Sequence, residues 1–391
     1  MSDISSLVLR VDTDRFGRFL FQIGVDPDRL TSTLQRIDDA HALFITMPLS
    51  QVASQLEKEV VVSSVFGTNT IEGGKLSEAE TAHVLQLDPD QIREVEQRRA
   101  INIKTAYDHA QAMAMTPGWR LDLDFIAKVH TLITRDLPDS NNLPGNFRDN
   151  SKDKITYVGD ESHGGRYKPP QYRADIQQLM EKLVAWHDRL LEQNVPALIR
   201  APLVHLYYEL IHPYWDGNGR VGRVLEATLL QAAGYRYAPF AMARYYLEHI
   251  DEYFSLFNVC RKLSDKGEAL PNMAFVDFHL EGMRRVIHRL HERGNRLVEV
   301  LLYASSIRAA LDRKEINARQ YTILSHLLEK GPTDYEVVRR SPWYESLYLK
   351  LNDKTRQRDL GKLRDLNYLR VDAKNRIGPA IAWSEGAIQS L

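Results

Sequence analysis

The stretch Ile211-His212-Pro213-Tyr214-Trp215-Asp216-Gly217-Asn218-Gly219-Arg220-Val221-Gly222-Arg223 separates two helix-like apolar segments and decides the fold around it. The first helix is expected to end at His212, because a proline disfavours helical backbone in the residue before it. Gly217 and Gly219 allow a sharp turn, and a second helix is expected from Arg220. A glycine-rich turn that leads into a helix N-terminus is a ready binding site for an anion.

The polar side chains of this stretch favour a phosphate and metal site beside a base. Arg220 and Arg223 lie three positions apart and so share one helix face. Two cations in a first helical turn oppose the helix dipole, which a bound polyanion would offset. Asp216 suits a Mg²⁺ ion that bridges to phosphates, and His212 is placed as a general base.

Two other phosphate motifs do not explain the stretch. Gly217, Gly219 and Gly222 match G-x-G-x-x-G in form, but that dinucleotide motif requires a preceding strand, and here a helix comes first. The pattern G-x-x-x-x-G-K-[ST] does not occur, which excludes a P-loop.

The composition is that of an ordinary globular protein. The chain has 391 residues, of which 43% are hydrophobic and 26% charged, and a net charge of −1. This balance gives no overall attraction to nucleic acid or membrane. The single cysteine, Cys260, excludes an internal disulfide and fits a reducing, cytoplasmic location. No signal-peptide pattern and no run of about 18 apolar residues is found, so no membrane association is expected.

The rest of the sequence predicts an all-α fold class with one small β-hairpin. Apolar residues at helical spacing predict helices over residues 29–43, 49–71, 122–135, 169–191, 196–211, 220–233, 244–263 and 272–302. The only convincing β signal before residue 300 is at 154–158, with 166–168 as its hairpin partner.

Glu72 is placed unfavourably at the end of the helix predicted over 49–71. The pair Gly73-Gly74 is expected to stop that helix. A carboxylate in the last turn faces the negative end of the helix dipole, which costs roughly 0.3–1 kcal/mol. We therefore expect Glu72 to have a cationic partner.

Residues 212–223 resemble the signature of the Fic (filamentation induced by cAMP) family, H-x-F-x-[DE]-G-N-G-R-x-x-R, with Tyr214 in place of the usual Phe. The resemblance covers roughly residues 50–300 and implies a helical core that transfers AMP from ATP to a protein hydroxyl, with Mg²⁺ as cofactor. By motif position, His212 would deprotonate the target Ser, Thr or Tyr, and Asp216 would hold Mg²⁺. The residues that would contact phosphates are Gly217, Asn218, Gly219, Arg220 and Arg223. Arg220 argues against the Doc-type kinases, which carry Lys there, whereas phosphocholine transfer stays open.

Residues 68–73 resemble the inhibitory-helix motif [ST]-x-x-x-E-[GN] that some Fic proteins carry before their core. The resemblance implies that Glu72 pairs with Arg223, occupies the γ-phosphate site and blocks productive ATP binding. Thr68 lies one turn earlier and is expected to fix Glu72 by a hydrogen bond or to bond its own backbone. Gly73 completes the motif.

Residues 154–168 resemble the flap of the family, which would capture a target segment along its strand edge. Val158 and Gly159 fall where such a flap approaches the nucleotide. His249 stands where many relatives have an Asn near adenine, so it is a candidate for the adenine pocket. Tyr207 is expected either in the aromatic core or in the lining of that pocket.

The C-terminal part differs in character from about residue 312. Three helical patterns followed by extended segments at 368–371 and 377–382 predict a winged-helix domain, and residues 354–360 resemble its recognition helix. Residues 315–391 hold 13 Lys and Arg against 10 Asp and Glu, a net charge of only +3. DNA-binding modules are usually more basic, so docking or dimerisation is favoured over DNA contact.

The predicted layout is an N-terminal helical region (1–115) with the inhibitory helix at about 49–74, a Fic core (116–303) and a winged-helix-like domain (304–391). The leading hypothesis is a protein adenylyltransferase restrained by Glu72, with ATP and a target protein as partners. Self-modification and a homodimer remain open. The alternatives are a nucleotide-sensing DNA-binding regulator and a hydrolase that removes AMP from modified hydroxyls.

Overall fold

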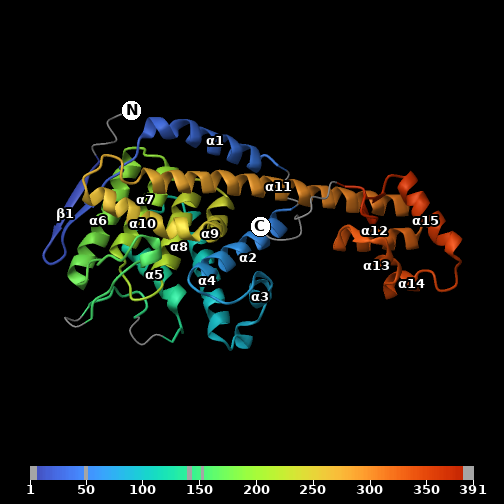
Figure 1. The fold of residues 1–391 in the computed structure, drawn as a ribbon, viewed down its shortest axis with the longest axis horizontal. Helices are drawn as coiled ribbons and strands as arrows, with labels where there is room; N and C mark the ends of the chain where they lie inside the picture. The colour runs from blue at the N-terminus through green and yellow to red at the C-terminus, as the bar shows by residue number, and fades with distance from the viewer. Residues whose placement is uncertain (1–6, 48–51, 139–142, 151–153, 382–391) are drawn as a thin grey trace. The chain divides into compact units, whose positions relative to one another are not determined.

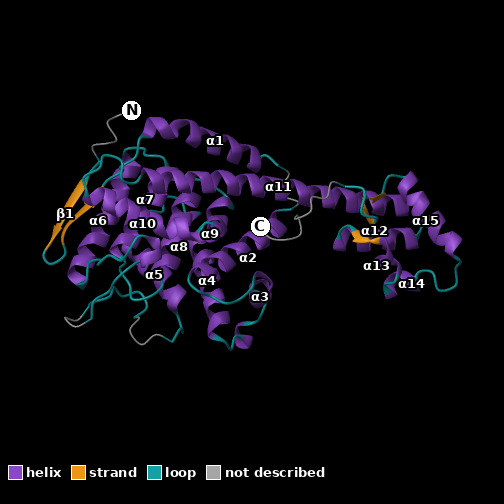
Figure 2. Ribbon diagram, viewed as in Figure 1, coloured by secondary structure: helices purple, strands orange, loops and turns teal. Residues whose placement is uncertain are grey.

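The computed structural model describes residues 7–47, 52–138, 143–150 and 154–381 (Figure 1). Among the described residues the chain divides into two compact units: the first comprises residues 7–46 and 54–291, and the second comprises residues 47, 52–53 and 292–381. Helices dominate and strands are few and short (Figure 2). Within the described residues, no helix is long and apolar enough to cross a membrane.

The first unit is helical apart from one hairpin. Its elements are β1 (Leu9–Thr13), β2 (Gly17–Phe21), α1 (Pro27–Ile45), α2 (Ala53–Ile71), α3 (Glu78–Val84), α4 (Val95–Ala114), α5 (Leu123–Thr134), α6 (Arg173–Glu192), α7 (Ala197–Ile211), α8 (Asn218–Ala232), α9 (Ala238–Glu248), α10 (Ile250–Asp265), the start of α11 (Met273–Asp312) and the 3₁₀ turns η3 (Pro89–Gln91) and η4 (Glu161–His163). The predicted all-α fold class is confirmed. Residues 49–51 of the predicted inhibitory helix lie outside the described residues.

Helices α7 and α8 form the centre of this unit. Every α7 residue from Leu198 to Ile211 is buried, and so is almost all of α8. A helix that is buried all round belongs to a core rather than to a surface. Helices α4, α5 and α9 pack on α8, while α6 packs on α7. The turn between α7 and α8 is thereby held in the middle of the unit.

The prediction of β structure before residue 300 was wrong in two respects. Strands β1 and β2 form an unpredicted antiparallel hairpin, in which Leu9 pairs with Phe21. Residues 154–168 contain an isolated bridge between Val158 and Tyr167 instead of two strands. The physical reason is that a side chain takes the place of a partner strand. The Gln171 amide accepts a bond from the Thr156 N–H at 2.8 Å and donates to the Thr156 carbonyl at 3.1 Å, so this backbone is already paired.

Two helix predictions also need correction. The single helix predicted over 244–263 is broken into α9 and α10 at His249, whose φ of −124° and ψ of 39° lie outside the helical region. Helix α11 continues past residue 302 to Asp312. Its last turns place Tyr303, Ile307 and Ala310 in a hydrophobic core of the second unit.

The second unit combines short helices with a three-stranded antiparallel sheet in the order β3-β5-β4. Its elements are α12 (Ala318–Lys330), β3 (Thr333–Asp334), α13 (Tyr335–Arg339), α14 (Pro342–Ser346), α15 (Asp353–Asp365), β4 (Leu369–Val371) and β5 (Arg376–Pro379). Asp359 of α15 is buried and accepts hydrogen bonds from Arg319 and Tyr348. The winged-helix assignment stays a prediction, and its residues 382–391 lie outside the described part of the chain.

Candidate active site

The turn between α7 and α8 has left-handed backbone at both ends. His212 ends α7 with a φ of 51°, and its N–H still donates to the Tyr208 carbonyl at 2.9 Å. Gly217, with a φ of 82°, precedes α8. Helix α8 begins at Asn218, two residues earlier than predicted. The predicted arrangement of helix, glycine turn and helix is therefore present, and the N–H groups of the first turn of α8 are available to an anion.

Asn218 holds the turn with its side chain. Its Oδ1 accepts a bond from the Tyr214 N–H at 2.9 Å, and its Nδ2 donates to the Tyr214 carbonyl at 2.8 Å. Since the amide is used in this way, a phosphate contact of Asn218 would have to come from its backbone N–H.

Two residues that the sequence did not single out support the same turn. His130 of α5 stacks on Tyr214, with ring centroids 3.6 Å apart. Its Nδ1 accepts a bond from the Gly145 N–H at 2.9 Å, so Nε2 carries the proton and donates to the Asp216 carbonyl at 3.1 Å. Arg148 is fully buried, and its Nε donates to the His212 carbonyl at 2.8 Å. No local pattern distinguishes either residue from an ordinary core or loop residue.

The His212 imidazole is partly exposed, with 21% of the side chain accessible. Its Nδ1 is buried and has no hydrogen-bond partner among the described residues. The distance from Nδ1 to Oε2 of Glu209 is 3.6 Å. The Glu209 carbonyl accepts a bond from the Tyr167 hydroxyl at 2.7 Å, which attaches the 154–168 segment to α7. With Nδ1 buried, Nε2 is the ring nitrogen left to exchange a proton with a bound molecule.

Asp216 pairs with Arg220, whose Nη2 lies 2.6 Å from Oδ2. Burial by itself would raise the pKa of Asp216, but the attraction of Arg220 and its hydrogen bond lower the pKa below its usual value. The carboxylate is therefore ionised and 38% exposed, which fits a Mg²⁺ ligand. No group of three or more His, Cys, Asp or Glu able to hold a metal occurs within the described ranges.

Arg223 pairs with Glu72, as the helix-dipole argument required. Its Nη2 donates to Oε1 of Glu72 at 2.7 Å and to the Thr68 carbonyl at 3.3 Å. The Arg223 side chain is 2% exposed and that of Glu72 is 25% exposed. A Cβ on Gly219 would collide with the Glu72 carboxylate, so this carboxylate lies over the first turn of α8.

The expected hydrogen bond from Thr68 to Glu72 is replaced by another. The Thr68 hydroxyl is buried and lies 3.0 Å from the Tyr107 hydroxyl of α4. Thr68 therefore contributes to the pair through its backbone carbonyl. The predicted stop after α2 is confirmed, since Gly73 has a φ of 79° and its N–H donates to the Thr70 carbonyl at 3.0 Å.

Residues 120–230, which include this turn, match the profile of the "Fic/DOC family". This part of the chain is therefore a Fic domain. Among curated proteins the chain is similar to "Protein adenylyltransferase fic-1" of Caenorhabditis elegans, at 24% identity over 63% of this chain and 45% of the relative. It is likewise similar to "Protein adenylyltransferase Fic" of Drosophila ananassae, at 24% identity over 64% of this chain and 46% of the relative. The chain thus spans less than half the length of these relatives.

Solved structures of Fic proteins share the fold. A Fic family protein from Desulfovibrio desulfuricans matches 91% of this chain and 97% of its own, with a TM-score of 0.55 and 16% identity. A Fic domain containing signaling protein from Bacteroides thetaiotaomicron matches 66% of this chain and 97% of its own, with a TM-score of 0.56 and 17% identity. Hereafter His212–Arg223 is called the Fic motif.

A buried chain of hydrogen bonds extends from Arg223 of the Fic motif into the core. Its Nη1 lies 3.4 Å from the Tyr253 hydroxyl, which lies 3.0 Å from Nε2 of His205. Nδ1 of His205 is 2.8 Å from Oε2 of Glu226. Burial alone would raise the pKa of Glu226, but His279 and His205 hold it well below its usual range. The chain ends on an ionised carboxylate that orients the groups behind Arg223.

The structure brings other predicted site residues to different surroundings. The Tyr207 hydroxyl donates to the Gln22 carbonyl at 2.9 Å, and its ring packs in the core against Phe21 and Trp186. The core alternative therefore describes Tyr207, because both its hydroxyl and its ring have partners inside the core. The His249 Nδ1 bonds the Tyr245 carbonyl at 2.9 Å. That contact gives the adenine assignment of His249 no support.

In the flap, Val158 forms the bridge with Tyr167, and Gly159 follows it directly. Gly159 has a φ of 87°, and a Cβ there would lie 2.7 Å from the Gly165 carbonyl oxygen. Asn258 of α10 donates to that same oxygen at 2.7 Å and to the His163 carbonyl at 3.0 Å. The flap is therefore fastened to α10. Its approach to a nucleotide stays a prediction.

Proposed function

We propose that the protein transfers AMP from ATP to a hydroxyl group of a protein. The observation that carries this proposal is the grouping of the glycine turn, the first turn of α8, Arg220 and Arg223 beside the His212 ring at the end of α7. Helix N–H groups and two buried guanidinium groups suit a polyphosphate. The names of the curated relatives, protein adenylyltransferases, agree with it.

In the proposed reaction, the target hydroxyl oxygen attacks the α-phosphorus while Nε2 of His212 takes the hydroxyl proton. A new P–O bond forms, the bond from the α-phosphorus to the bridging oxygen breaks, and pyrophosphate leaves. Asp216 would hold Mg²⁺, which would neutralise charge on the phosphates. Arg220 would exchange its present bond to Asp216 for a phosphate oxygen.

We further propose that Glu72 restrains this activity. Its carboxylate pairs with Arg223 and lies over Gly219, where an anion bound to the first turn of α8 would lie. Two anions cannot share one guanidinium and one helix end without strong repulsion. ATP therefore binds productively after Glu72 has moved away.

The test compares label from two positions of ATP in the presence of Mg²⁺. With α-labelled ATP we expect weak auto-labelling of the unaltered protein, strong labelling of Glu72→Gly and none of Glu72→Gly combined with His212→Ala. With γ-labelled ATP we expect no labelling. Two results would refute the proposed transfer. One is labelling by γ-labelled ATP but not by α-labelled ATP. The other is that Glu72→Gly transfers no α label to itself or to any added protein.

Removal of AMP is a second candidate, because one oxygen of Glu72 is uncommitted. Oε1 is bonded to Arg223, whereas Oε2 makes no hydrogen bond within the described residues. On a side chain that is 25% exposed, Oε2 could direct a water at an AMP-modified hydroxyl. Release of AMP from a pre-labelled protein by the unaltered chain, abolished in Glu72→Gly, would support this function.

A further inference from the structure

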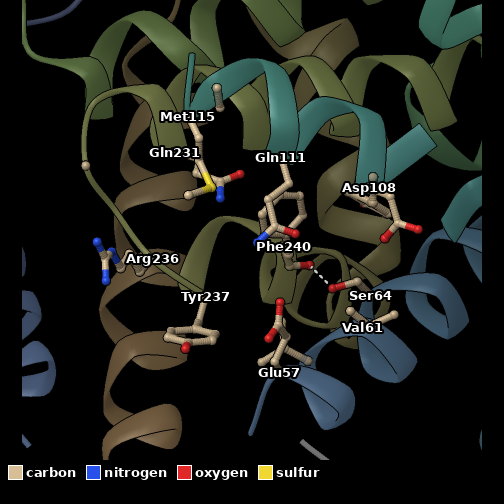
Figure 3. Close-up of a pocket in the computed structure, with 14 residues that line it drawn as sticks. Glu57, Val61, Ser64, Asp108, Gln111, Met115, Gln231, Arg236, Tyr237 and Phe240 are labelled. Atoms are coloured by element: carbon tan, nitrogen blue, oxygen red, sulfur yellow. Dashed lines mark hydrogen bonds between the residues drawn. The ribbon is translucent and has the colours of Figure 1, made fainter. Parts of the chain in front are cut away.

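A cavity of about 320 Å³ opens between α2, α4 and the connection from α8 to α9 (Figure 3). Its volume falls at the lower end of the range of small-molecule sites. None of the residues that line it within the described chain belongs to the Fic motif. The cavity is therefore separate from the proposed ATP site.

The lining of the cavity has two hydrogen-bond acceptors without a donor from the described residues, a buried one on Gln231 and a solvent-exposed one on Glu57. Oε1 of Gln231 is buried and has no hydrogen-bond partner among the described residues. The Glu57 carboxylate points toward the middle of the site, between Tyr237 and Ser64 (Figure 3), and in the described chain it forms no ion pair or hydrogen bond. The Ser64 hydroxyl cannot serve either acceptor, because it bonds the Phe240 carbonyl.

The charges around the cavity favour a cation. In Figure 3 the guanidinium of Arg236 lies at the edge and is directed away from the other labelled side chains. Asp108 is already paired with Lys104. Glu57 is thus the charge that faces the interior, while Val60, Val61 and Phe240 supply apolar surface.

The cavity wall also contains strained backbone. Tyr237 has a φ of 62° and a ψ of −50°, and the Ala238 N–H donates to the Arg236 carbonyl at 2.7 Å. This is a γ-turn of the rare kind with positive φ. Such strain tends to occur where a ligand is clamped, because the surrounding structure must hold it in place.

We propose that this cavity binds a small amphipathic amine, with its N–H donors on the Glu57 and Gln231 acceptors and its hydrocarbon part between Val61 and Phe240. The site also reaches the inhibitory pair, because Tyr107 lines the cavity and its hydroxyl bonds Thr68, whose carbonyl bonds Arg223. The cavity is present while Glu72 pairs with Arg223, and we propose that its ligand binds this state more tightly than the state in which Glu72 has moved away, which would stabilise the pair. This regulatory part rests on the proposed function.

Binding is tested on the full chain with three probes of equal length: hexylammonium, hexanoate and 1-hexanol, each followed by ligand-observed saturation-transfer NMR. Hexylammonium should bind about tenfold more tightly than hexanoate, since one head group is attracted by Glu57 and the other repelled. Ala114→Phe should abolish binding by filling the cavity, while Ala112→Phe on the exposed side of α4 should not. Glu57→Gln should weaken hexylammonium several-fold, and Glu59→Gln, which makes the same charge change on α2, should not.

Hexanoate binding as tightly as hexylammonium, or hexylammonium binding retained in both Ala114→Phe and Glu57→Gln, would overturn the site. Thermal unfolding of each variant establishes that it is folded. Hexylammonium should also lower auto-labelling of the unaltered protein several-fold and leave Glu72→Gly unchanged. If hexylammonium binds but does not lower auto-labelling, the proposed regulation by this cavity is overturned. If no protein is labelled at all, the result counts against the proposed AMP transfer and does not affect the conclusion on binding.

Discussion

Oε1 of Glu72 lies 2.7 Å from Nη2 of Arg223, and this pair connects the last turn of α2 to the first turns of α8 across 151 residues of sequence. The pair resolves two local conflicts at once. Glu72 stands at the negative end of the α2 dipole, and Arg223, in the second turn of α8, is a buried cation that requires an anionic partner. Each side chain supplies the opposite charge that the other needs, so an anion that competes for this place must neutralise the buried Arg223 guanidinium as Glu72 does.

Glu72→Gln should raise auto-labelling by about tenfold or more, because a charge-assisted bond of roughly 1.5–3 kcal/mol is replaced by a weaker neutral one of the same shape. Initial rates with α-labelled ATP measure the effect. Glu78→Gln is the matched control, since Glu78 pairs with Arg244 at 3.0 Å and is similarly exposed. Equal rates in the two variants would contradict the inhibitory role of Glu72.

Tyr253→Phe should weaken the site without touching the Fic motif itself. It removes the hydroxyl between Arg223 and His205 and leaves Nε2 of a buried histidine without its partner. We expect a loss of about 1–3 kcal/mol in unfolding free energy, and in the Glu72→Gly background weaker ATP binding. Denaturant titration and nucleotide binding measure the two effects. Tyr245→Phe is the control, because the hydroxyl that it removes has no hydrogen bond to described residues. Its unfolding free energy and its ATP binding should stay close to those of the parent protein.

Local rules predicted the framework of the site correctly. Pro213 ends α7 at His212, Gly217 permits the left-handed turn, and Gly73 ends α2, each through a conformational preference of a single residue. The same rules required a cation for Glu72, although the resemblance to the Fic family was needed to identify it as Arg223. The capping box that begins α3 is also a local feature, because its two residues, Ser77 and Glu80, lie within one helical turn.

Long-range partners could not be predicted in this way. The sequence allowed the Thr68 hydroxyl a partner in its own helix or on Glu72, but the tertiary structure places the Tyr107 hydroxyl of α4 beside it. His130 and Arg148 reach the turn from outside it, and nothing in the surrounding sequence marks them. The missed β1–β2 hairpin is stabilised by tertiary packing of Phe21 on Tyr207, about 186 residues away by sequence number.

Gly222→Ala should destabilise the centre of the first unit. A Cβ at this position would lie 2.6 Å from Oε1 of Glu209 and 2.7 Å from Cδ2 of His205, both buried. We expect a loss of about 1–3 kcal/mol, as for other overpacked core sites, measured as a lower unfolding midpoint. Gly361→Ala, in α15 where a Cβ meets nothing within 4 Å, should instead be neutral or stabilising. Equal effects of the two substitutions would show that the crowding at Gly222 does not matter.

The attachment of the flap to α10 should weaken as the pH rises. Hydrogen bonds to Asp160 and Asp251 raise the pKa of His163 above its ordinary value, and bonds from Ser162 and His163 lower the pKa of Asp160 to about 2. A raised histidine pKa stabilises the docked state fully below about pH 6.5 and is lost as the pH rises through the folded value. The flap should therefore be better protected at pH 6 than at pH 8.5.

Hydrogen exchange of residues 154–168, corrected for the intrinsic pH dependence of the exchange rate, measures that protection. His163→Asn should remove the pH dependence, because asparagine can still bond Asp160 but does not titrate. Asp265→Asn, which removes a carboxylate elsewhere on α10 that pairs with Arg261, should leave it intact. If His163→Asn keeps the same pH dependence, the link that His163 makes between the flap and Asp251 does not cause that dependence.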